Sequence, residues 1–334
     1  MDIQRRIKAF ARLGDFIRNI SQEELQTLTE NARNQNAWFT PASVEFALRS
    51  IGENMTEESL KNWVKNYKLS SVSKTVALVL AGNIPLVGFH DLLAVLISGH
   101  KALLKLSSKD QYLMDYLIRK ITAIDGALGE RIHLTERLKN FDAVIATGSD
   151  NTSRYFEYYF GKYPHIIRKN RTSVAILNGD ESDDELTALG NDVFMYFGLG
   201  CRNVSKVYVP ENYTFDKMFV SWESYKDIIH HHKYCNNYDY QKSILLVNME
   251  KFLDNGFVLL QPSDRIVSPI SVVYYEHYKD KAHLSAMLQK VGEKIQVVVG
   301  HSLPASIAFG HAQFPGLQDY ADNADTLHFL GELK

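Results

Sequence analysis

Cys201 lies in a stretch whose residue types and spacing could perform covalent chemistry. Gly198 and Gly200 precede it, and an extended run over 205–209 follows. A thiol on a glycine-flanked turn can attack a carbonyl carbon while backbone N–H groups face the developing oxyanion, as covalent acyl transfer requires. Most unpaired cysteines are instead small buried apolar residues, so residue type alone does not establish a nucleophile. We interpret Cys201 as a nucleophile because of what the rest of the chain contains.

Three further groups of small and polar residues lie at the ends of runs predicted to be buried parallel strands, at 76–80, 102–106 and 143–146. The groups are Ala81, Gly82 and Asn83; Lys105, Ser107 and Ser108; and Thr147, Gly148 and Ser149. Helical patterns over 88–98, 110–124 and 152–160 follow these groups in turn. This order predicts an open doubly wound sheet, in which ligands bind beyond the carboxyl ends of the strands. A Gly-Ser pair before a helix can also receive a phosphate, although it is equally a common helix cap.

The remaining segments complete an α/β architecture. Residues 1–70 are predicted to be helical, with apolar residues at helical spacing and no chemistry of their own. The acidic run 180–185 is interpreted as a solvated start of a helix that continues to about Phe197. Short strands predicted at 206–209, 244–247, 270–274 and 295–299 alternate with amphipathic helices and indicate a second α/β domain. The stretch from His301 is predicted to return to the first domain.

Composition excludes several classes of function. A chain of 334 residues with 45% hydrophobic and 23% charged residues is typical of a globular protein, and the net charge of -2 argues against a nucleic-acid partner. Two cysteines make no disulfide framework and lack metal-site spacing. Three consecutive histidines, 230–232, point in different directions, so no metal site is expected. No secretion signal or membrane span is recognised, and we expect a cytoplasmic protein.

Taken together, the motifs resemble those of the aldehyde dehydrogenase superfamily. The order and spacing of Gly82-Asn83-Ile84-Pro85, Lys105 to Ser108, Thr147 to Ser149 and Gly198-x-Gly200-Cys201 all agree with it. Within the superfamily, the chain is similar to the compact acyl-CoA reductases, such as the fatty-acid reductase subunit of bacterial luminescence systems. The resemblance runs from about residue 70 to the C-terminus and is strongest through Cys201. It implies two α/β domains with open, mostly parallel sheets.

The resemblance also implies roles for the motif residues. Asn83 would donate its side-chain amide, together with the Cys201 backbone N–H, to an oxyanion. Lys105 would hold the adenosine ribose of a nicotinamide cofactor, and Gly148 and Ser149 would carry its pyrophosphate. The same cofactor groove would be lined by Ala81, Gly82, Thr147 and Ser107.

Three departures from the superfamily pattern refine this expectation. Ser108, followed by Lys109, replaces a ribose-binding glutamate, which favours NADPH over NADH. The segment 168–171 places basic residues where hydrolysing members carry a general base, which favours reduction of a thioester over hydrolysis. Arg265 is the first residue of the segment 265–269, which aligns with a later motif of the superfamily whose glutamate belongs to the cofactor site.

The resulting hypothesis is NADPH-dependent reduction of an acyl-CoA, of the fatty acyl class, to the aldehyde through an acyl-enzyme on Cys201. The substrate could equally be an acyl-pantetheine thioester. A cysteine-dependent acyl transferase or thioesterase, and a non-catalytic binding protein on the same scaffold, are the alternatives. The expected division is a helical segment 1–70, a cofactor domain of 71–177 with about 301–334, and a catalytic domain 178–300. A homo-oligomer is compatible with this family.

Overall fold

The computed structural model describes residues 1–70, 72–148, 150–301, 303 and 306–334. The chain divides into two compact units, one of residues 1–170 with 315–334 and the other of residues 171–314. The four N-terminal helices therefore belong to the same unit as the first sheet. None of the helices in the described ranges is long and apolar enough to cross a membrane.

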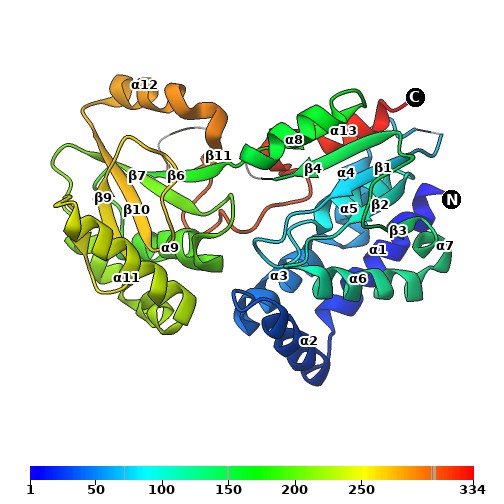
Figure 1. Ribbon diagram of the computed structural model, residues 1–334, viewed down its shortest axis with the longest axis horizontal. Coiled ribbons are helices and arrows are strands. Elements are labelled where there is room, and N and C mark those ends of the chain that lie inside the picture. Colours follow the sequence, from blue (N-terminus) through cyan, green and yellow to red (C-terminus); the bar gives the residue numbers. More distant parts are fainter. Residues whose placement is uncertain (71, 149, 302, 304–305) are drawn as a thin grey trace. The chain divides into compact units, whose positions relative to one another are not determined.

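The first unit is built around a five-stranded parallel sheet in the order β3-β2-β1-β4-β5 (Figure 1). Its strands are β1 (Thr75–Val79), β2 (Lys101–Lys105), β3 (Ile132–Leu134), β4 (Ala143–Thr147) and β5 (His165–Arg168). Its helices are α1 (Ile3–Arg18), α2 (Gln22–Gln35), α3 (Pro41–Asn54), α4 (Glu57–Val64), α5 (Phe89–Ile97), α6 (Gln111–Ile124), α7 (Gly126–Gly129), α8 (Asp150–Phe160) and α13 (Thr326–Gly331). The predicted βαβ order of this region is confirmed.

Alternation along the strands gives this sheet two buried faces. In β1, Val76 and Leu78 face a large core that includes α1, α5 and α6, while Ala77 faces a smaller cluster that includes Phe156 and Phe160 of α8. Helices on both faces are what an all-parallel sheet requires, because its strands are apolar on both sides. The sheet is therefore a rigid base for the loops at its edge.

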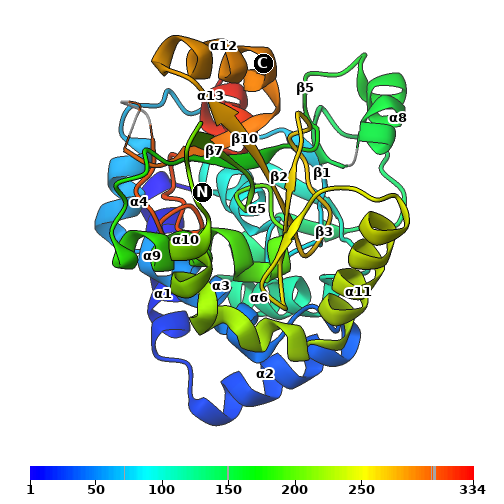
Figure 2. The same ribbon diagram turned by 90° about the vertical axis from the view of Figure 1, so that its left-hand side faces the viewer.

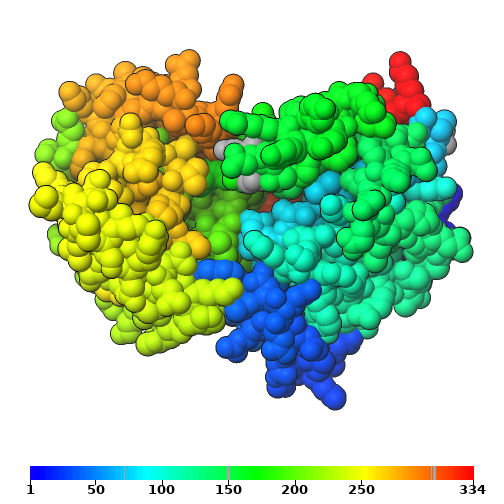
Figure 3. Space-filling model, in the orientation of Figure 1, coloured from blue at the N-terminus to red at the C-terminus, as the bar shows by residue number. Residues whose placement is uncertain are grey.

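The N-terminal helices begin and pack as their sequence predicts. Ser21 caps α2 by accepting from the Glu24 N–H, and Thr40 caps α3, whose first residue is Pro41. The apolar face of α1, which includes Phe10 and Leu13, is fully buried. Helix α2 buries less of its surface and lies at the exterior of this unit, in blue in Figure 3.

The second unit contains a six-stranded sheet in the order β11-β6-β7-β10-β9-β8, parallel except for β8. Its strands are β6 (Thr172–Ile176), β7 (Val204–Pro210), β8 (Leu253–Asp254), β9 (Leu259–Pro262), β10 (Val272–Tyr278) and β11 (Ile295–Val299). Its helices are α9 (Asp183–Phe194), α10 (Asp216–Trp222), α11 (His232–Val247) and α12 (Lys281–Val291), and Figure 2 shows α10 beside α9. Short 3-10 turns, η1 (Met195–Gly198), η2 (Glu223–His230), η3 (Gly292–Lys294) and, in the first unit, η4 (Ala321–Asn323), join these elements.

One predicted strand of this unit is wrong. The run 244–247 forms the last turn of α11, where Leu245 packs against Leu259 and Val272 of the sheet. Four apolar residues are too few to distinguish a short strand from the end of a helix. The other three strands predicted after Cys201 are present as β7, β10 and β11.

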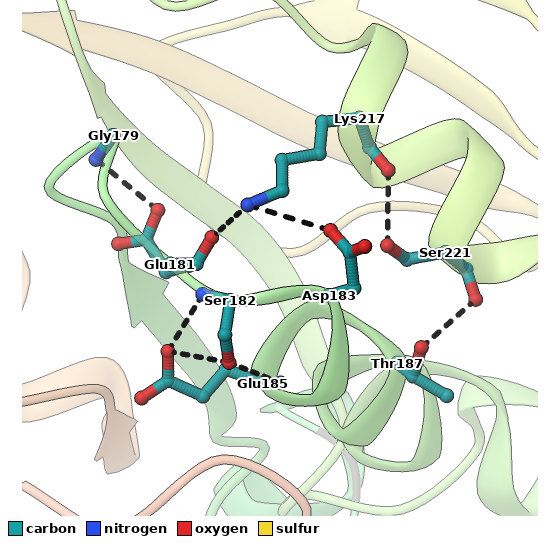
Figure 4. A network of polar contacts seen from close by, with 8 residues as sticks. All are labelled: Gly179, Glu181, Ser182, Asp183, Glu185, Thr187, Lys217 and Ser221. Atoms are coloured by element: carbon teal, nitrogen blue, oxygen red, sulfur yellow. Dashed lines mark hydrogen bonds and ion pairs between the residues drawn. The ribbon is translucent and has the colours of Figure 1, made fainter.

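The acidic run before α9 is only partly solvated. Ser182 and Glu185 form a reciprocal capping box, as acidic residues at a helix start favour. Glu181, however, is buried, and its carboxylate accepts a hydrogen bond from the Gly179 N–H (3.1 Å). The Lys217 ammonium group donates a hydrogen bond to the Glu181 backbone carbonyl (Figure 4). Lys217 also reaches Asp183 at 3.4 Å. The interpretation of this run as a wholly solvated helix start is therefore corrected at Glu181.

Candidate active site

The candidate cofactor residues of the first unit share one edge of its sheet. Val79, the last residue of β1, pairs with Lys105 of β2 on one side and with Ala146 of β4 on the other. From β1, the chain adds β2 and β3 on one side of the sheet and then β4 and β5 on the other, so the order of the strands changes direction between β1 and β4. Ligands of open α/β sheets bind at such a reversal, beyond the carboxyl ends of the strands. Ala81, Gly82 and Asn83 follow β1 at this place.

The loop after β1 and the loop after β2 approach each other very closely. A Cβ atom on Gly82 would lie 2.5 Å from Ser107 Oγ and 3.2 Å from Asp110 Cβ. Only a glycine fits this approach without displacing its neighbours. Beyond it, Asn83 is exposed. The chain then passes Leu86, which has a left-handed φ of 58°, before α5 begins.

Asp110 lies buried beneath this loop. Its Oδ2 accepts the Leu86 backbone N–H at 2.8 Å, and its side chain is enclosed at 1% exposure. Burial raises the pKa of Asp110 to about 8, and the hydrogen bond from Leu86 opposes this shift only in part. Near neutral pH the group is therefore a neutral carboxylic acid, which avoids placing an unpaired charge in the interior.

Asp110 is expected to make the protein less stable as the pH rises from about 4 to about 8. Across this window the folded protein keeps a proton that the unfolded chain has already released, because the pKa is raised from 3.8 to about 8. The free energy of unfolding then falls with increasing pH, and Asp110→Asn should remove this contribution. Denaturant unfolding at about pH 5 and about pH 8 measures the difference. Equal pH dependence in the wild type and the variant would contradict the expectation.

The other residues proposed for the cofactor lie where a ligand could reach them. Lys105 and Ser108 are exposed, and Ser107, Thr147 and Gly148 are partly exposed. Ser107 Oγ accepts the Lys109 N–H at 3.3 Å, which closes the turn between β2 and α6. Ser149 lies outside the described residues. Exposed polar and cationic groups at the ends of adjacent strands fit a phosphate-bearing dinucleotide.

The candidate nucleophile follows a left-handed turn in the second unit. Tyr196, Phe197 and Gly198 have φ angles of 54°, 58° and 75° in succession. For residues other than glycine this conformation costs roughly 1–2 kcal/mol each, so the surrounding structure must hold the turn in place. Cys201 itself is partly exposed at the end of this turn. The predicted glycine turn before Cys201 is thus present at Gly198.

Asn203 is the side chain that holds this turn. Its Oδ1 accepts the Gly200 N–H at 2.8 Å, and its Nδ2 donates to the carbonyls of Met195 (2.7 Å) and Val193 (3.2 Å). These bonds satisfy carbonyl groups that the end of α9 leaves without helical partners. The Cys201 carbonyl in turn accepts the Ser173 hydroxyl at 3.0 Å. The backbone on both sides of the thiol is therefore fixed by buried or partly buried hydrogen bonds.

A second buried group, Asp192, ties the end of α9 to the segment 310–312. Its two carboxyl oxygens accept the N–H groups of Gly310 (2.7 Å) and Ala312 (2.9 Å). Burial raises the pKa of Asp192 to about 6 despite these bonds. Arg202, which follows the candidate nucleophile, donates to the Ala312 carbonyl at 3.3 Å. The cysteine turn is thus anchored to a segment more than a hundred residues later.

A small cavity lies beside the cysteine turn within the second unit. It has a volume of about 30 Å³, and its lining includes Phe197 and Gly198 of the turn, Tyr234 of α11, and Pro269 and Ile270. The cavity is lined by residues of the cysteine turn, of α11 and of the segment before β10.

Two basic residues considered in the sequence have structural contacts. Arg168 ends β5, where its buried guanidinium pairs with Asp91 of α5 and donates to the Thr326 hydroxyl at 3.0 Å. These contacts give Arg168 a structural role within the first unit. Arg265 is exposed in the second unit and lies over the Tyr274 ring at 5.5 Å.

The three histidines are divided between two elements. His230 ends η2 and His232 begins α11, while the His231 ring packs on Phe197 at a centroid distance of 4.4 Å. Within the described ranges, no group of three or more histidine, cysteine or acidic side chains could hold a metal ion. The contact of His231 with the cysteine turn was not predictable from the triplet itself.

The fold matches those of solved aldehyde dehydrogenases. Aldehyde dehydrogenase 21 from Physcomitrella patens, in complex with the reaction product succinate, has a TM-score of 0.66 and 14% identity over 91% of this chain and 74% of that chain. A mutant aldehyde dehydrogenase C from Pseudomonas syringae, with NAD+ and octanal, has a TM-score of 0.64 and 12% identity over 90% and 73%. An E. coli NADP-dependent enzyme has a TM-score of 0.65 and 12% identity, over 89% of this chain and 77% of that chain. These similarities confirm the predicted fold.

The sequence comparison identifies the branch of this fold. No curated protein sequence matches the chain. The profile of the acyl-CoA reductase (LuxC) family matches residues 10–219, which is more than half of the chain and includes Asn83, Lys105 and Cys201. The chain therefore belongs to the LuxC family of acyl-CoA reductases.

Proposed function

We propose that this protein reduces an acyl-CoA of the fatty acyl class to the aldehyde, with Cys201 as nucleophile and NADPH as reductant. The observation that carries the proposal is that one family match spans Cys201, Asn83 and Lys105 together. The hydrogen bonds of Asn203 that fix the turn before Cys201, one buried and one partly buried, support a role in which the position of the thiol matters. Preorganisation of this kind is typical of covalent catalysis.

In the first half of the reaction, the Cys201 thiolate attacks the carbonyl carbon of the thioester. A new carbon–sulfur bond forms, and the carbonyl oxygen becomes an oxyanion that accepts hydrogen bonds from the Asn83 amide and the Cys201 N–H. When the oxyanion collapses, the bond to the CoA sulfur breaks. CoA leaves as a thiolate and takes a proton from solvent, and the acyl group remains on Cys201.

In the second half, the acyl-enzyme is reduced. The reduced cofactor, held by Lys105, Ser108 and Gly148, would supply a hydride when bound. Addition of that hydride to the carbonyl carbon would leave a thiohemiacetal on Cys201. The same two donors stabilise its oxyanion, and collapse releases the aldehyde and the Cys201 thiolate. The sum is one thioester, one reduced cofactor and one proton converted to one aldehyde, one CoA and one oxidised cofactor.

The segment that would supply a general base for hydrolysis carries no carboxylate. Residues 168–171 read Arg-Lys-Asn-Arg, and the Arg168 side chain is held by Asp91 and Thr326. Activation of water against an acyl-enzyme requires a base close to the reacting carbon. Basic residues in place of this base support a mechanism in which the acyl-enzyme is not hydrolysed before it is reduced.

A single assay distinguishes the proposal from its alternatives. Purified enzyme, incubated with a series of acyl-CoA chain lengths, should oxidise NADPH and form one aldehyde for each CoA released. An acyl transferase or thioesterase would release CoA without oxidising NADPH. A non-catalytic binding protein would release no CoA at all. Either of these results would contradict the proposed reduction.

Ser108→Glu is expected to reverse the preference for NADPH over NADH. Ser108 is exposed one residue before Lys109, and a carboxylate there would repel a 2′-phosphate but accept hydrogen bonds from ribose hydroxyls. The kcat/KM for NADPH should fall about tenfold or more, which corresponds to a loss of about 1.4 kcal/mol. Ser224→Glu, which adds the same charge at an exposed position of the second unit, is the matched control. An unchanged ratio of the two cofactors in Ser108→Glu would argue against this site for the ribose.

A further inference from the structure

A side-chain contact to a distant position in the chain helps to hold the loop that carries Asn83. The Leu86 N–H donates to Asp110 Oδ2 at 2.8 Å, and both residues are buried. Leu86 has a φ of 58°, a conformation that residues other than glycine adopt only when their surroundings enforce it. Its carbonyl also accepts the Phe89 N–H at 2.9 Å, where α5 begins. Without Asp110, the buried Leu86 N–H would lose this acceptor.

Asp110 is placed at a helix start but does not cap the helix. It is the N-cap residue of α6, and its side chain makes no capping hydrogen bond. Aspartate at this position normally accepts an N–H of the first helical turn. Here the carboxyl group is turned to the loop, and its Cβ lies 3.2 Å from the place of a Cβ on Gly82, the residue before Asn83. The geometry favours support of the loop over support of the helix.

We propose that Asp110 is a positioning residue that fixes the oxyanion donor Asn83 by holding the loop of residues 80–88 through the Leu86 N–H. This inference rests on the proposed function, because it assumes that Asn83 binds the oxyanion. Asp110 is a hydrogen-bond acceptor for a backbone N–H and does not contact the substrate.

The protonation state of Asp110 suits this role. Its Oδ1 is buried and has no hydrogen-bond partner among the residues that the structure describes. Burial raises the pKa of the group to about 8. A neutral acid can still accept the Leu86 N–H through Oδ2, but it adds no negative charge beneath a loop that must stabilise an oxyanion. Asparagine can replace it in both respects.

The test compares Asp110→Ala with Asp110→Asn in the full-length enzyme at neutral pH. The alanine variant should lower the rate of CoA release from the acyl-CoA by about 10- to 100-fold, as expected when a donor is displaced by a fraction of an ångström. The asparagine variant should restore most of the rate, since its carbonyl oxygen can accept the same N–H. Alkylation of Cys201 by iodoacetamide, which needs no oxyanion donor, should be unchanged in both. Thr56→Ala removes the cap of α4 and is the matched control for loss of stability alone.

A double-mutant cycle separates this inference from the proposed function. If Asp110 acts through Asn83, Asp110→Ala should cause no further loss in an Asn83→Ala background. Multiplying losses, or a lower melting temperature with an unchanged rate of CoA release, would overturn the inference. If Asn83→Ala alone has no effect, the proposed oxyanion role itself fails. Should the alanine variant not fold, Asp110→Leu fills the site without an acceptor and gives the same comparison.

Discussion

Cys201→Ala is expected to abolish aldehyde formation from acyl-CoA, with a loss of at least about 10⁴-fold, because no other group in the scheme can carry the acyl chain. Cofactor binding should persist, since the proposed cofactor residues of the first unit are unaltered. The measurement is the initial rate of NADPH oxidation with acyl-CoA, together with a binding titration of NADPH. The variant is expected to fold, because a cysteine-to-alanine change at a partly exposed position removes little packing.

Cys235→Ala is the matched control for this experiment. Cys235 is the other cysteine of the chain, it is also partly exposed, and its Sγ lies 3.6 Å from Asp239 on α11. Partial burial and the neighbouring carboxylate raise the pKa of this thiol, which disfavours the thiolate. Its loss should leave the rate unchanged. Equal loss in both variants, or normal aldehyde formation by Cys201→Ala, would remove Cys201 from the mechanism.

Asn83→Ala is expected to lower kcat by about 10²- to 10³-fold, the usual effect of deleting one oxyanion donor. The KM for acyl-CoA should change little, because the interaction is made with the transition state rather than with the ground state. Steady-state rates with saturating NADPH measure both constants. Asn83 is exposed, so the substitution should have little effect on stability.

Asn237→Ala serves as the control for Asn83→Ala. Asn237 donates within α11 to the Lys233 carbonyl at 2.7 Å, and it has no part in the proposed chemistry. Its variant should keep the wild-type kcat. A large rise in KM with an unchanged kcat in Asn83→Ala would show ground-state binding of the substrate, and would contradict the oxyanion role.

The first unit was predictable because its strands are short and apolar, and because glycine residues mark where its strands and helices end. Val76 to Leu80 forms a continuous apolar run that ends at Gly82, and Gly99, with φ of 97°, stops the helix that follows. Strands buried on both faces have this uniform pattern, and the βαβ order then fixes a parallel sheet. The alignment of candidate cofactor residues along one edge follows from that topology alone.

The second unit was less predictable where local pattern and packing disagree. The apolar run 244–247 closes a helix whose earlier residues, rich in asparagine and tyrosine, have no clear helical pattern. Glu181 was assigned to solvent by its charged neighbours, but its side chain is buried and its carboxylate accepts a backbone N–H of a loop that is otherwise exposed. Such roles depend on which backbone groups lie nearby, and that information is absent from the composition of the segment.

The residues that hold the candidate site gave weak signals in the sequence. Asp110 follows Lys109 and resembles an ordinary helix cap, whereas its acceptor role depends on Leu86, 24 positions earlier. Asn203 follows Cys201 closely, and an asparagine beside a glycine turn could have suggested a local cap. Asp192 gave no such signal, because its partners Gly310 and Ala312 lie far along the chain.

The most direct test of the central claim is the mass of the enzyme after incubation with acyl-CoA in the absence of reduced cofactor. We predict one acyl group per chain, located by peptide mapping on Cys201, and lost as free aldehyde when NADPH is added. An acyl group on another residue, or formation of aldehyde with no acyl-enzyme in a rapid-quench experiment, would contradict the account.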